Sequence, residues 1–358
     1  MNSEELIEYF TQIIQLIMNR IGGASNLTED KNAQKLITSI LKDLDTLGIK
    51  SNQVMPIELE KAYNNALEIA SKELIDMGVT PPPIKKKIHM AAVKELISKT
   101  MSDLKKAVTR AKSNAKVMVN RVVSRTKSEI AKGLILGNHS KIVKKRVAKM
   151  FQEEGITGFA TKDKNGRDVN IRIEDYASRV VRTKMRDANT QGAVNRYIES
   201  GVTLVQVSKH SPSCAVCGRF AGMVISLDDS NKGFKSINEP GIELPPFHPN
   251  CRHTVKSWVI TYKSDEEIQQ EKDKWKSFNP EKDVRSVSQQ KAYKKEQDIR
   301  RKANDARKQY EKMTAVLGKD KMPKTLGGFI RGKQSKSKTY LKLQQQYRQA
   351  NRELKAEG

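Results

Sequence analysis

The chain has 358 residues and a formal net charge of +26, with 37% hydrophobic and 5% aromatic residues. An apolar content this low argues against one large globular core and favours an elongated, helical protein that depends on partners. No run of about 18 or more apolar residues is present, and the first residues lack the basic and apolar regions of a secretory leader. We therefore expect a protein that is made in a cytoplasm and has no membrane partner.

The charge is distributed unevenly along the chain. Residues 1–80 carry seven Lys and Arg against twelve Asp and Glu, a net charge of −5, so the remainder carries +31. An acidic first part and a basic remainder suggest two kinds of partner, a protein for the first and a polyanion such as nucleic acid for the second. The alternative is that the lysines only solubilise helical surfaces, and net charge alone does not decide between the two.

Apolar residues recur at three- and four-residue steps through the first part of the chain, which predicts amphipathic helices. In chain order they cover residues 4–20, 32–47, 56–77, 84–133 and a shorter basic segment that ends at about residue 154. The run Pro81-Pro82-Pro83 is the strongest break in this pattern. A helix as long as residues 84–133 cannot bury its own apolar stripe, so it needs other helices or other subunits to pack against.

The pattern changes after residue 154. Residues 155–173 alternate in polarity and contain Asn165-Gly166, a strong hairpin signal. A helix over residues 173–200 follows, and strands are predicted over residues 202–208 and 223–227.

Beyond Trp258 the chain is rich in Lys, Glu, Gln and Arg. Helices are predicted over residues 265–275, 286–317 and 340–354, whereas the Gly- and Lys-rich residues 318–337 predict a loop or flexible arm. Sparse apolar residues among many basic ones are typical of a surface that becomes ordered on a partner.

All three cysteines lie in one stretch, in Cys214-Ala-Val-Cys217 and His248-Pro-Asn-Cys251-Arg-His253. Two thiolates separated by two residues can hold one metal ion from a tight turn, and a His-x-x-Cys pair from a second loop completes the four ligands typical of structural zinc. The simplest ligand set is Cys214, Cys217, His248 and Cys251, and the alternates are His253 and His210.

Free cysteines packed as small hydrophobic residues are the first rival interpretation of this stretch. A disulfide is the second, and an odd cysteine count disfavours it.

A metal-dependent nuclease is a further alternative, because a His beside a zinc site on a basic protein could act as a general base. Such an enzyme would also need carboxylates for a catalytic ion. The only nearby carboxylate pair is Asp228 and Asp229, with no matching His spacing. We therefore predict a protein without enzymatic activity. His89 and His139 lie in basic helical sequence and are predicted to be ordinary surface residues.

These patterns together predict a mainly α protein with a small α+β central domain. Elongated helical parts at both ends are expected to flank a module made of a hairpin and a zinc knuckle. The predicted parts are an acidic helical module (1–80), long basic helices (81–154), the central domain with the Cys and His donors (155–260), and a basic, partly flexible C-terminal region (261–358).

Short motifs follow one another in order through the central part. They are Gly155-Ile-Thr-Gly-Phe, Gly166-Arg, Tyr176-Ala, Arg182-Thr, Gly201-Val, Val207-Ser-x-His210, Cys214-x-x-Cys217, Gly222 and His248-Pro-Asn-Cys251-Arg-His253. This series resembles the minor capsid, or minor head, proteins of tailed bacteriophages and the wider group of Mu F-like head-morphogenesis proteins. The resemblance implies a few-copy virion component, in the capsid interior or at the portal vertex, that acts in head assembly and in DNA packaging or delivery. It also implies a portal or major head protein as partner, while the basic regions suggest double-stranded DNA.

Overall fold

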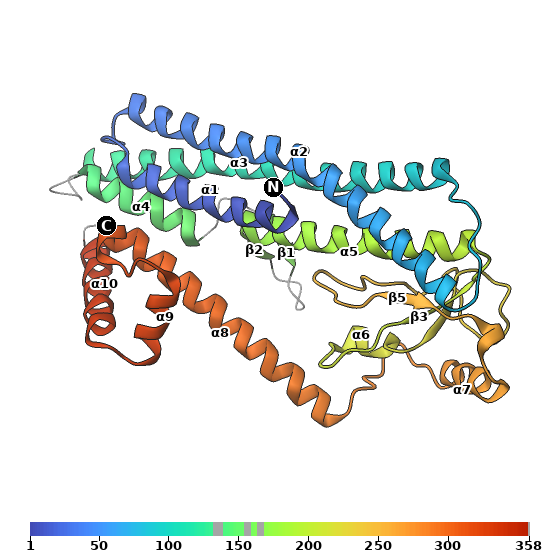
Figure 1. Ribbon diagram of the computed structural model, residues 1–358. Coiled ribbons are helices and arrows are strands. Elements are labelled where there is room, and N and C mark those ends of the chain that lie inside the picture. Colours follow the sequence, from blue (N-terminus) through green and yellow to red (C-terminus); the bar gives the residue numbers. More distant parts are fainter. Residues whose placement is uncertain (132–138, 154–158, 163–167, 357–358) are drawn as a thin grey trace. The chain divides into compact units, whose positions relative to one another are not determined.

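The computed structural model describes residues 1–131, 139–153, 159–162 and 168–356 (Figure 1). Its helices are α1 (Ser3–Gly23), α2 (Asp30–Asp76), α3 (Lys86–Ala131), α4 (His139–Glu153), α5 (Ile173–Glu199), α6 (Ala215–Phe220), α7 (Asp265–Lys276), α8 (Val287–Leu317), α9 (Leu326–Gln334) and α10 (Lys338–Ala356). Its strands are β1 (Phe159–Lys162), β2 (Asp168–Ile171), β3 (Leu204–Val207), β4 (Val224–Ser226) and β5 (Val255–Ser257), and short 3-10 helices lie at Ile260–Tyr262 and Lys319–Lys321. The described protein is therefore mainly helical, as predicted.

Two compact units are built from non-consecutive parts of the chain. The first unit comprises Met1–Ser3, Asn52–Asp103 and Ser178–Asp298, and the second comprises Glu4–Ser51, Leu104–Ala177 and Ile299–Gly358. These units follow proximity in space, whereas the predicted division at residues 80, 154 and 260 follows composition along the chain. That four-part division stays a prediction.

The two helices predicted on either side of residue 50 are in fact one helix, α2, with Pro56 in its interior. Pro56 has no N–H to bond to the carbonyl of Asn52, which costs about 3 kcal/mol in a helix interior. However, the neighbouring side chains of Val54, Met55 and Leu59 are buried. Full burial of such a side chain contributes about 1.5–3 kcal/mol. The free energy gained by burying these side chains therefore exceeds the cost of the proline, and the helix continues.

The second unit buries the apolar stripes that the sequence predicted. The buried residues of α1 are Leu6, Phe10, Ile13, Ile14, Ile17 and Ile21. Those of α3 within this unit include Leu104, Val108, Ala111, Ala115, Val119 and Val123. Each set recurs at three- and four-residue steps, so one face of each helix is removed from water.

Ion pairs in the second unit join the acidic and basic parts of the sequence. Lys112 Nζ lies 2.6 Å from Asp45 Oδ1, and Lys127 Nζ lies 2.6 Å from Asp30 Oδ1. Both carboxylates belong to α2 and both lysines to α3. Part of the negative charge of residues 1–80 is thus neutralised within the protein itself, which the uneven charge distribution did not reveal.

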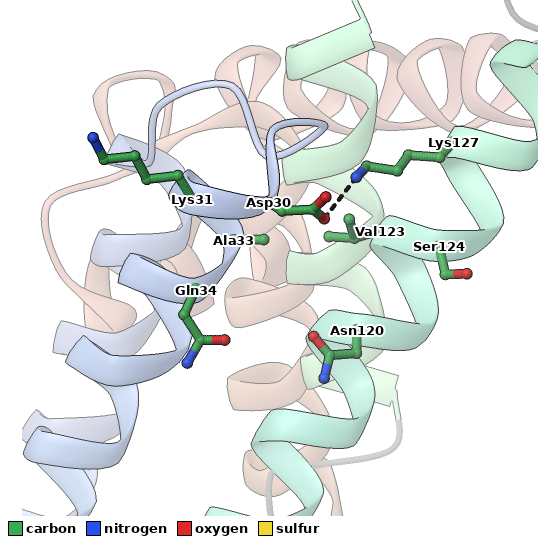
Figure 2. Close-up of a pocket in the computed structure, with 8 residues that line it drawn as sticks. All are labelled: Asp30, Lys31, Ala33, Gln34, Asn120, Val123, Ser124 and Lys127. Atoms are coloured by element: carbon green, nitrogen blue, oxygen red, sulfur yellow. Dashed lines mark hydrogen bonds and ion pairs between the residues drawn. The ribbon is translucent and has the colours of Figure 1, made fainter.

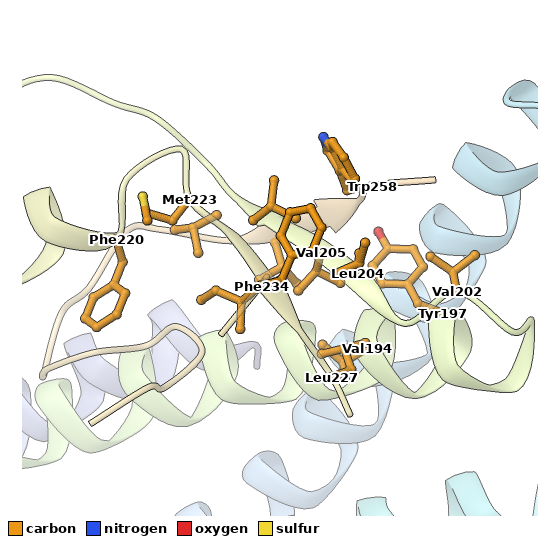
Figure 3. Close-up of a cluster of buried hydrophobic side chains, with 14 of the residues drawn as sticks. Val194, Tyr197, Val202, Leu204, Val205, Phe220, Met223, Leu227, Phe234 and Trp258 are labelled. Atoms are coloured by element: carbon orange, nitrogen blue, oxygen red, sulfur yellow. The ribbon is translucent and has the colours of Figure 1, made fainter. Parts of the chain in front are cut away.

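The first unit contains an antiparallel sheet with the strand order β4-β3-β5. Val205 in β3 pairs with Ile225 in β4 on one side and with Ser257 in β5 on the other. Side chains of the sheet pack against Val194 and Tyr197 of α5 in the main apolar cluster of this unit (Figure 3). The strands β3 and β4 confirm predictions, whereas β5 was not predicted because its three residues, Val-Lys-Ser, are too short to carry a pattern.

The hairpin predicted over residues 155–173 is present as the antiparallel pair β1 and β2, with Phe159 opposite Ile171 and Lys162 opposite Asp168. Its predicted turn residues, Asn165-Gly166, lie outside the described part of the chain.

A half-buried carboxylate, that of Glu73, joins α2, α5 and β5 in the first unit. Glu73 Oε2 accepts a hydrogen bond from the Tyr197 hydroxyl at 2.6 Å. Glu73 Oε1 accepts hydrogen bonds from the backbone N–H and the hydroxyl of Ser257, at 2.9 and 2.7 Å. Burial and the hydrogen bond to Glu73 raise the pKa of Tyr197, so the phenol stays protonated and keeps donating.

Replacing Tyr197 with Phe is therefore expected to destabilise the first unit by about 2 kcal/mol, because a hydrogen bond to a charged group is removed inside the protein. Both tryptophans of the chain, Trp258 and Trp275, lie in the apolar cluster of this unit, so tryptophan fluorescence during urea unfolding measures the change. Tyr262→Phe is the matched control, since Tyr262 is 57% exposed and should change stability by less than about 0.5 kcal/mol. Equal effects of both substitutions would contradict the structural role of Tyr197.

The segment predicted as a loop or flexible arm, residues 318–337, is largely ordered, and that prediction is wrong. It contains a 3-10 turn and the helix α9, whose first turn is capped by Thr325 Oγ1 accepting from the N–H of Gly328 at 3.1 Å. The ring of Phe329 lies 5.4 Å from that of Tyr310 and 5.5 Å from that of Tyr340. Burial of this one aromatic residue stabilises a helix whose glycines alone would favour a loop.

His89 is not a surface residue, contrary to prediction. It is buried in the first unit, with Nδ1 2.9 Å from the Tyr63 hydroxyl and Nε2 3.3 Å from Glu199. A helical pattern shows which residues share a face, and here the face of α3 that carries His89 packs against α2 and α5. The side chain of His139 lies outside the described residues.

Candidate metal centre

The first Cys pair lies at the start of α6, a short helix where the sequence predicted only a turn. Cys214 is the N-cap residue of α6, and its sulfur accepts a hydrogen bond from the backbone N–H of Cys217 at 3.4 Å. Cys217 therefore lies in the first helical turn, three residues after the cap. This geometry directs both sulfurs to one side of the loop, as the Cys-x-x-Cys spacing predicts for a metal ligand pair.

The second donor pair is held by a tight turn. The N–H of Cys251 donates to the carbonyl of His248 at 3.0 Å, and Asn250 has a φ of 64°, a left-handed conformation that Asn tolerates well. His248 Nδ1 lies 2.8 Å from the carbonyl oxygen of Pro249. That contact needs a proton on Nδ1, so in the neutral ring the lone pair lies on Nε2, which is the nitrogen available for a metal ion.

The two donor pairs meet in space. His248 Nε2 lies 3.2 Å from Cys214 Sγ and 3.0 Å from Cys217 Sγ, and Cys217 Sγ lies 3.7 Å from Cys251 Sγ. Two thiolates bound to one tetrahedral zinc, each at about 2.3 Å, are about 3.8 Å apart. All three cysteines are free, so the structure shows no disulfide among them, and their sulfurs lie close to the same imidazole or to each other.

Cys217 belongs to two overlapping groups of donors. One group is Cys214, Cys217 and His248, and the other is Cys217, Cys251 and His253. His253 is fully buried, and its Nε2 has no hydrogen-bond partner among the described atoms. The nitrogen of His253 that faces Cys251 is Nδ1, so the unpartnered Nε2 lies on the other side of the ring. The thiol and imidazole donors of the two groups are those that a soft or borderline metal ion prefers.

The sheet explains why the two alternate histidines are neighbours. Val207 at the end of β3 pairs with Val255 at the start of β5, so the residues just beyond these ends face each other. His210 Nε2 accordingly lies 3.0 Å from His253 Nδ1, and His253 Nδ1 lies 3.8 Å from Cys251 Sγ. The unpredicted strand β5 is thus what brings His253 and Cys251 to the first Cys pair.

Hydrogen bonds within the cluster shift the pKa values of its donors in opposite directions. Hydrogen bonding with Cys217 lowers the pKa of Cys214 and of Cys251 to about 3, and the same contacts raise the pKa of Cys217. The hydrogen bond with Cys214 raises the pKa of His248 to about 9. The lowered pKa values of Cys214 and Cys251 favour the thiolate, which is the form that coordinates metal ions. Binding of an ion would have to displace the protons held by Cys217 and His248.

Two arginines hold the donor loop in place, and the sequence did not reveal them. Arg285 donates to the carbonyl of Ser213 at 3.0 Å and binds Asp283 through two nitrogens, at 2.8 and 2.6 Å. Arg252 donates to the carbonyl of Pro212 at 3.2 Å. Arg285 follows Ser213 by about 70 residues, so no local spacing could have signalled this contact.

A surface hollow in the second unit lacks the Cys and His donors of this cluster. This hollow between α2 and α3, of about 510 Å³, contains the Asp30–Lys127 ion pair among small and amide side chains (Figure 2). Its other polar residues are Lys31, Gln34, Asn120 and Ser124. It offers one exposed carboxylate and no cluster of donors, so the Cys and His cluster remains the strongest candidate site among the described residues.

Comparison with known proteins agrees with the resemblance noted in the sequence. The family model of phage minor capsid protein 2 matches residues 24–350, almost the whole chain. The chain belongs to that family. No curated protein and no solved structure matches it. Membership makes this minor capsid protein a structural component of a phage head and of the virion. Among its described helices, none has the length and apolar character needed to cross a bilayer.

Proposed function

We propose that this minor capsid protein is a low-copy component near the portal vertex, on the inner side of the capsid, and that it works by attachment rather than by catalysis. The observation that carries the proposal is the family match over residues 24–350. In this position the protein would act in head assembly and in DNA packaging or delivery. Its partners would be a portal or major head protein and double-stranded DNA.

The acidic N-terminal part, residues 1–80, is the proposed contact for the head or portal protein. Four isoleucines of α2, Ile49, Ile57, Ile69 and Ile75, are each more than half exposed. Burying these side chains against a protein would remove their apolar surface from water and so stabilise the contact.

For the metal, we propose that Cys214, Cys217, His248 and Cys251 hold one zinc ion, with His253 and His210 as alternates. The donor types and the distances within the cluster support this assignment. When bound, the ion would supply folding free energy and no reaction. The sheet of the first unit is small, and a metal ion compensates for a small core in many short domains.

The alternative of a metal-dependent nuclease has no specific support in the described residues. Asp228 Oδ1 accepts hydrogen bonds from the N–H and the hydroxyl of Ser230, at 3.0 and 2.6 Å, and Asp229 Oδ2 accepts from Asn238 at 3.1 Å. The Ser230 hydroxyl lowers the pKa of Asp228. These carboxylates stabilise their own loop, which accounts for them without a catalytic ion.

Phage particles assembled without this chain test the proposed role. A stop codon early in its gene is expected to leave expression of the other head proteins intact and to yield under-filled or non-infectious heads. Electron microscopy of the heads, their DNA content and plaque counts measure this, and the intact chain supplied from a plasmid is the control. Protein quantification in purified virions should find the chain at far lower copy number than the major head protein. Full infectivity without the chain, or its absence from purified particles, would refute the role.

A further inference from the structure

The C-terminal helix pair has an extreme charge composition. Residues 321–352 contain no Asp or Glu and nine basic residues, namely Lys321, Lys324, Arg331, Lys333, Lys336, Lys338, Lys342, Arg348 and Arg352. This stretch covers α9, the turn Ser335-Lys336-Ser337 and most of α10 (Figure 1). A solvated helix in an ordinary protein carries charges of both signs. A stretch with basic residues and no carboxylate therefore indicates an anionic partner.

One face of α10 is used for packing. Tyr340, Leu343 and Ala350 are buried, and the first two belong to an apolar cluster with Phe329 of α9 and Met313 of α8. At about 100° per residue, these three positions lie on one side of the helix. The fold of the C-terminal helices therefore determines which side of α10 is turned outward.

The outward side of α10 is basic along its length. Lys338, Lys342, Arg348 and Arg352 are exposed and fall within an arc of about 120° opposite the buried face. They extend over about 21 Å, since each helical residue rises about 1.5 Å. Gln345 and Gln349 lie between them on the same face, and both are exposed. We refer to the four basic residues as the α10 stripe.

The cations of the α10 stripe have no ion-pair partner among the described residues, in contrast to those of other helices in the same unit. Lys112 and Lys127 of α3 each lie 2.6 Å from a carboxylate of α2, and Arg172 pairs with both Glu174 and Glu311. Within the described residues, the second unit thus neutralises many of its cations internally but places no carboxylate against this stripe.

We infer that the α10 stripe binds double-stranded DNA, with the helix lying in the major groove and its cations contacting phosphates on both sides. This inference rests on the proposed role of the protein as a head component that contacts DNA, and it identifies the element responsible. The major groove is about 12 Å wide and accommodates one α-helix. A short turn before a packed second helix is also the arrangement by which helix-turn-helix proteins present a helix to DNA.

The packing of α10 argues for DNA over an anionic lipid surface. A helix that binds a bilayer inserts its apolar face between the lipids. The apolar face of α10 is occupied by contacts with α8 and α9. Among the large apolar side chains of this helix that the structure describes, only Leu341 is exposed. Phosphates of DNA require no apolar insertion, because affinity comes from the release of counterions.

Substitution of the stripe by glutamine tests the inference. The full-length variant Lys338→Gln, Lys342→Gln, Arg348→Gln, Arg352→Gln keeps good helix formers at each position and removes four positive charges. Binding to a mixed-sequence DNA duplex is measured by fluorescence anisotropy at several salt concentrations. The affinity is expected to fall at least about tenfold. The slope of log K against log salt should become shallower by about 0.9 for each phosphate that the variant no longer neutralises.

A matched control removes the same charge elsewhere. Lys94, Lys105, Lys106 and Lys116 are exposed lysines of α3, and their joint replacement by Gln should leave the affinity within about threefold of wild type. Far-UV circular dichroism checks that both variants keep their helix content. Equal decreases in affinity for the two variants would show a general charge effect and would overturn the assignment to α10.

The remaining outcomes separate this inference from the proposed function. If the wild-type chain binds DNA and the α10 variant binds equally well, the DNA contact stands and the α10 assignment fails. If the wild-type chain does not bind DNA at any salt concentration, both the proposed DNA contact and its assignment to α10 fail. Binding of the wild type to vesicles rich in anionic lipid, weakened in the α10 variant and without any binding to DNA, would overturn the choice of DNA as the ligand.

Discussion

Replacing Cys217 with Ser is expected to remove the metal and to unfold residues 200–260, while the helices of the second unit stay folded. Cys217 is common to both groups of donors, so no complete ligand set remains without it. Structural zinc contributes an apparent 10–16 kcal/mol, roughly, in small zinc modules, which is comparable to the whole stability of an ordinary domain. The small sheet of the first unit is therefore expected not to persist without it.

The measurements for this variant are metal content by mass spectrometry and protease sensitivity. The wild-type chain should contain about one zinc, the variant close to none, and new cleavage sites should appear within residues 200–260. Val216→Ser is the matched control, because it introduces the same residue at the adjacent, exposed position of α6. Wild-type protein that is free of metal and still protease-resistant in this region would refute the metal centre.

The replacement of Gly192 with Ala is expected to destabilise the first unit by about 2 kcal/mol. Gly192 is a buried residue of α5, and a Cβ there would collide with the backbone carbonyl oxygen of Tyr63 in α2 and approach Ala66 Cβ to 3.2 Å. Alanine is intrinsically better in a helix by about 1 kcal/mol. Overpacking costs about 1–3 kcal/mol, and more where backbone must move, so the collision determines the sign.

Gly48→Ala is the matched control for that prediction. Gly48 also lies inside a helix, but its nearest contact, Val108 Cγ1 at 3.8 Å, is an ordinary van der Waals distance. This substitution should be neutral or stabilise the second unit by up to about 1 kcal/mol. Urea unfolding followed by tryptophan fluorescence reports the first unit, and circular dichroism reports both. A Gly192→Ala protein as stable as wild type would show that α5 and α2 are not in close contact.

Much of the helical content could be predicted from the sequence, because a buried helix face repeats every three or four residues. The buried stripe of α1 and the seam of α3 were predicted for this reason. The donors Cys214, Cys217, His248 and Cys251 were identified for a related reason, since each pair is positioned by a turn of a few residues. The family resemblance likewise depended on short local motifs.

Features that depend on distant residues could not be predicted. The sequence predicted separate helices over residues 32–47 and 56–77, and only the burial of the neighbours of Pro56 shows why α2 continues through it. The glycines of α9 predicted a flexible arm, and only Phe329 between two tyrosine rings explains its order. In each case a local preference of a few kcal/mol at most is outweighed by apolar burial that involves another part of the chain.

The sequence by itself determined the helical class of the protein, the candidate metal donors and the family. Tertiary structure alone decided how these donors meet, because the pairing of β3 with β5 places His253 beside His210 and Cys251 beside Cys217. It also decided that His89 is buried and that Gly192 is a point of helix contact. The physical reason is the same for each. Local spacing records the geometry of one turn or one helix face, whereas contacts between segments far apart in the chain leave no periodic signal in the sequence.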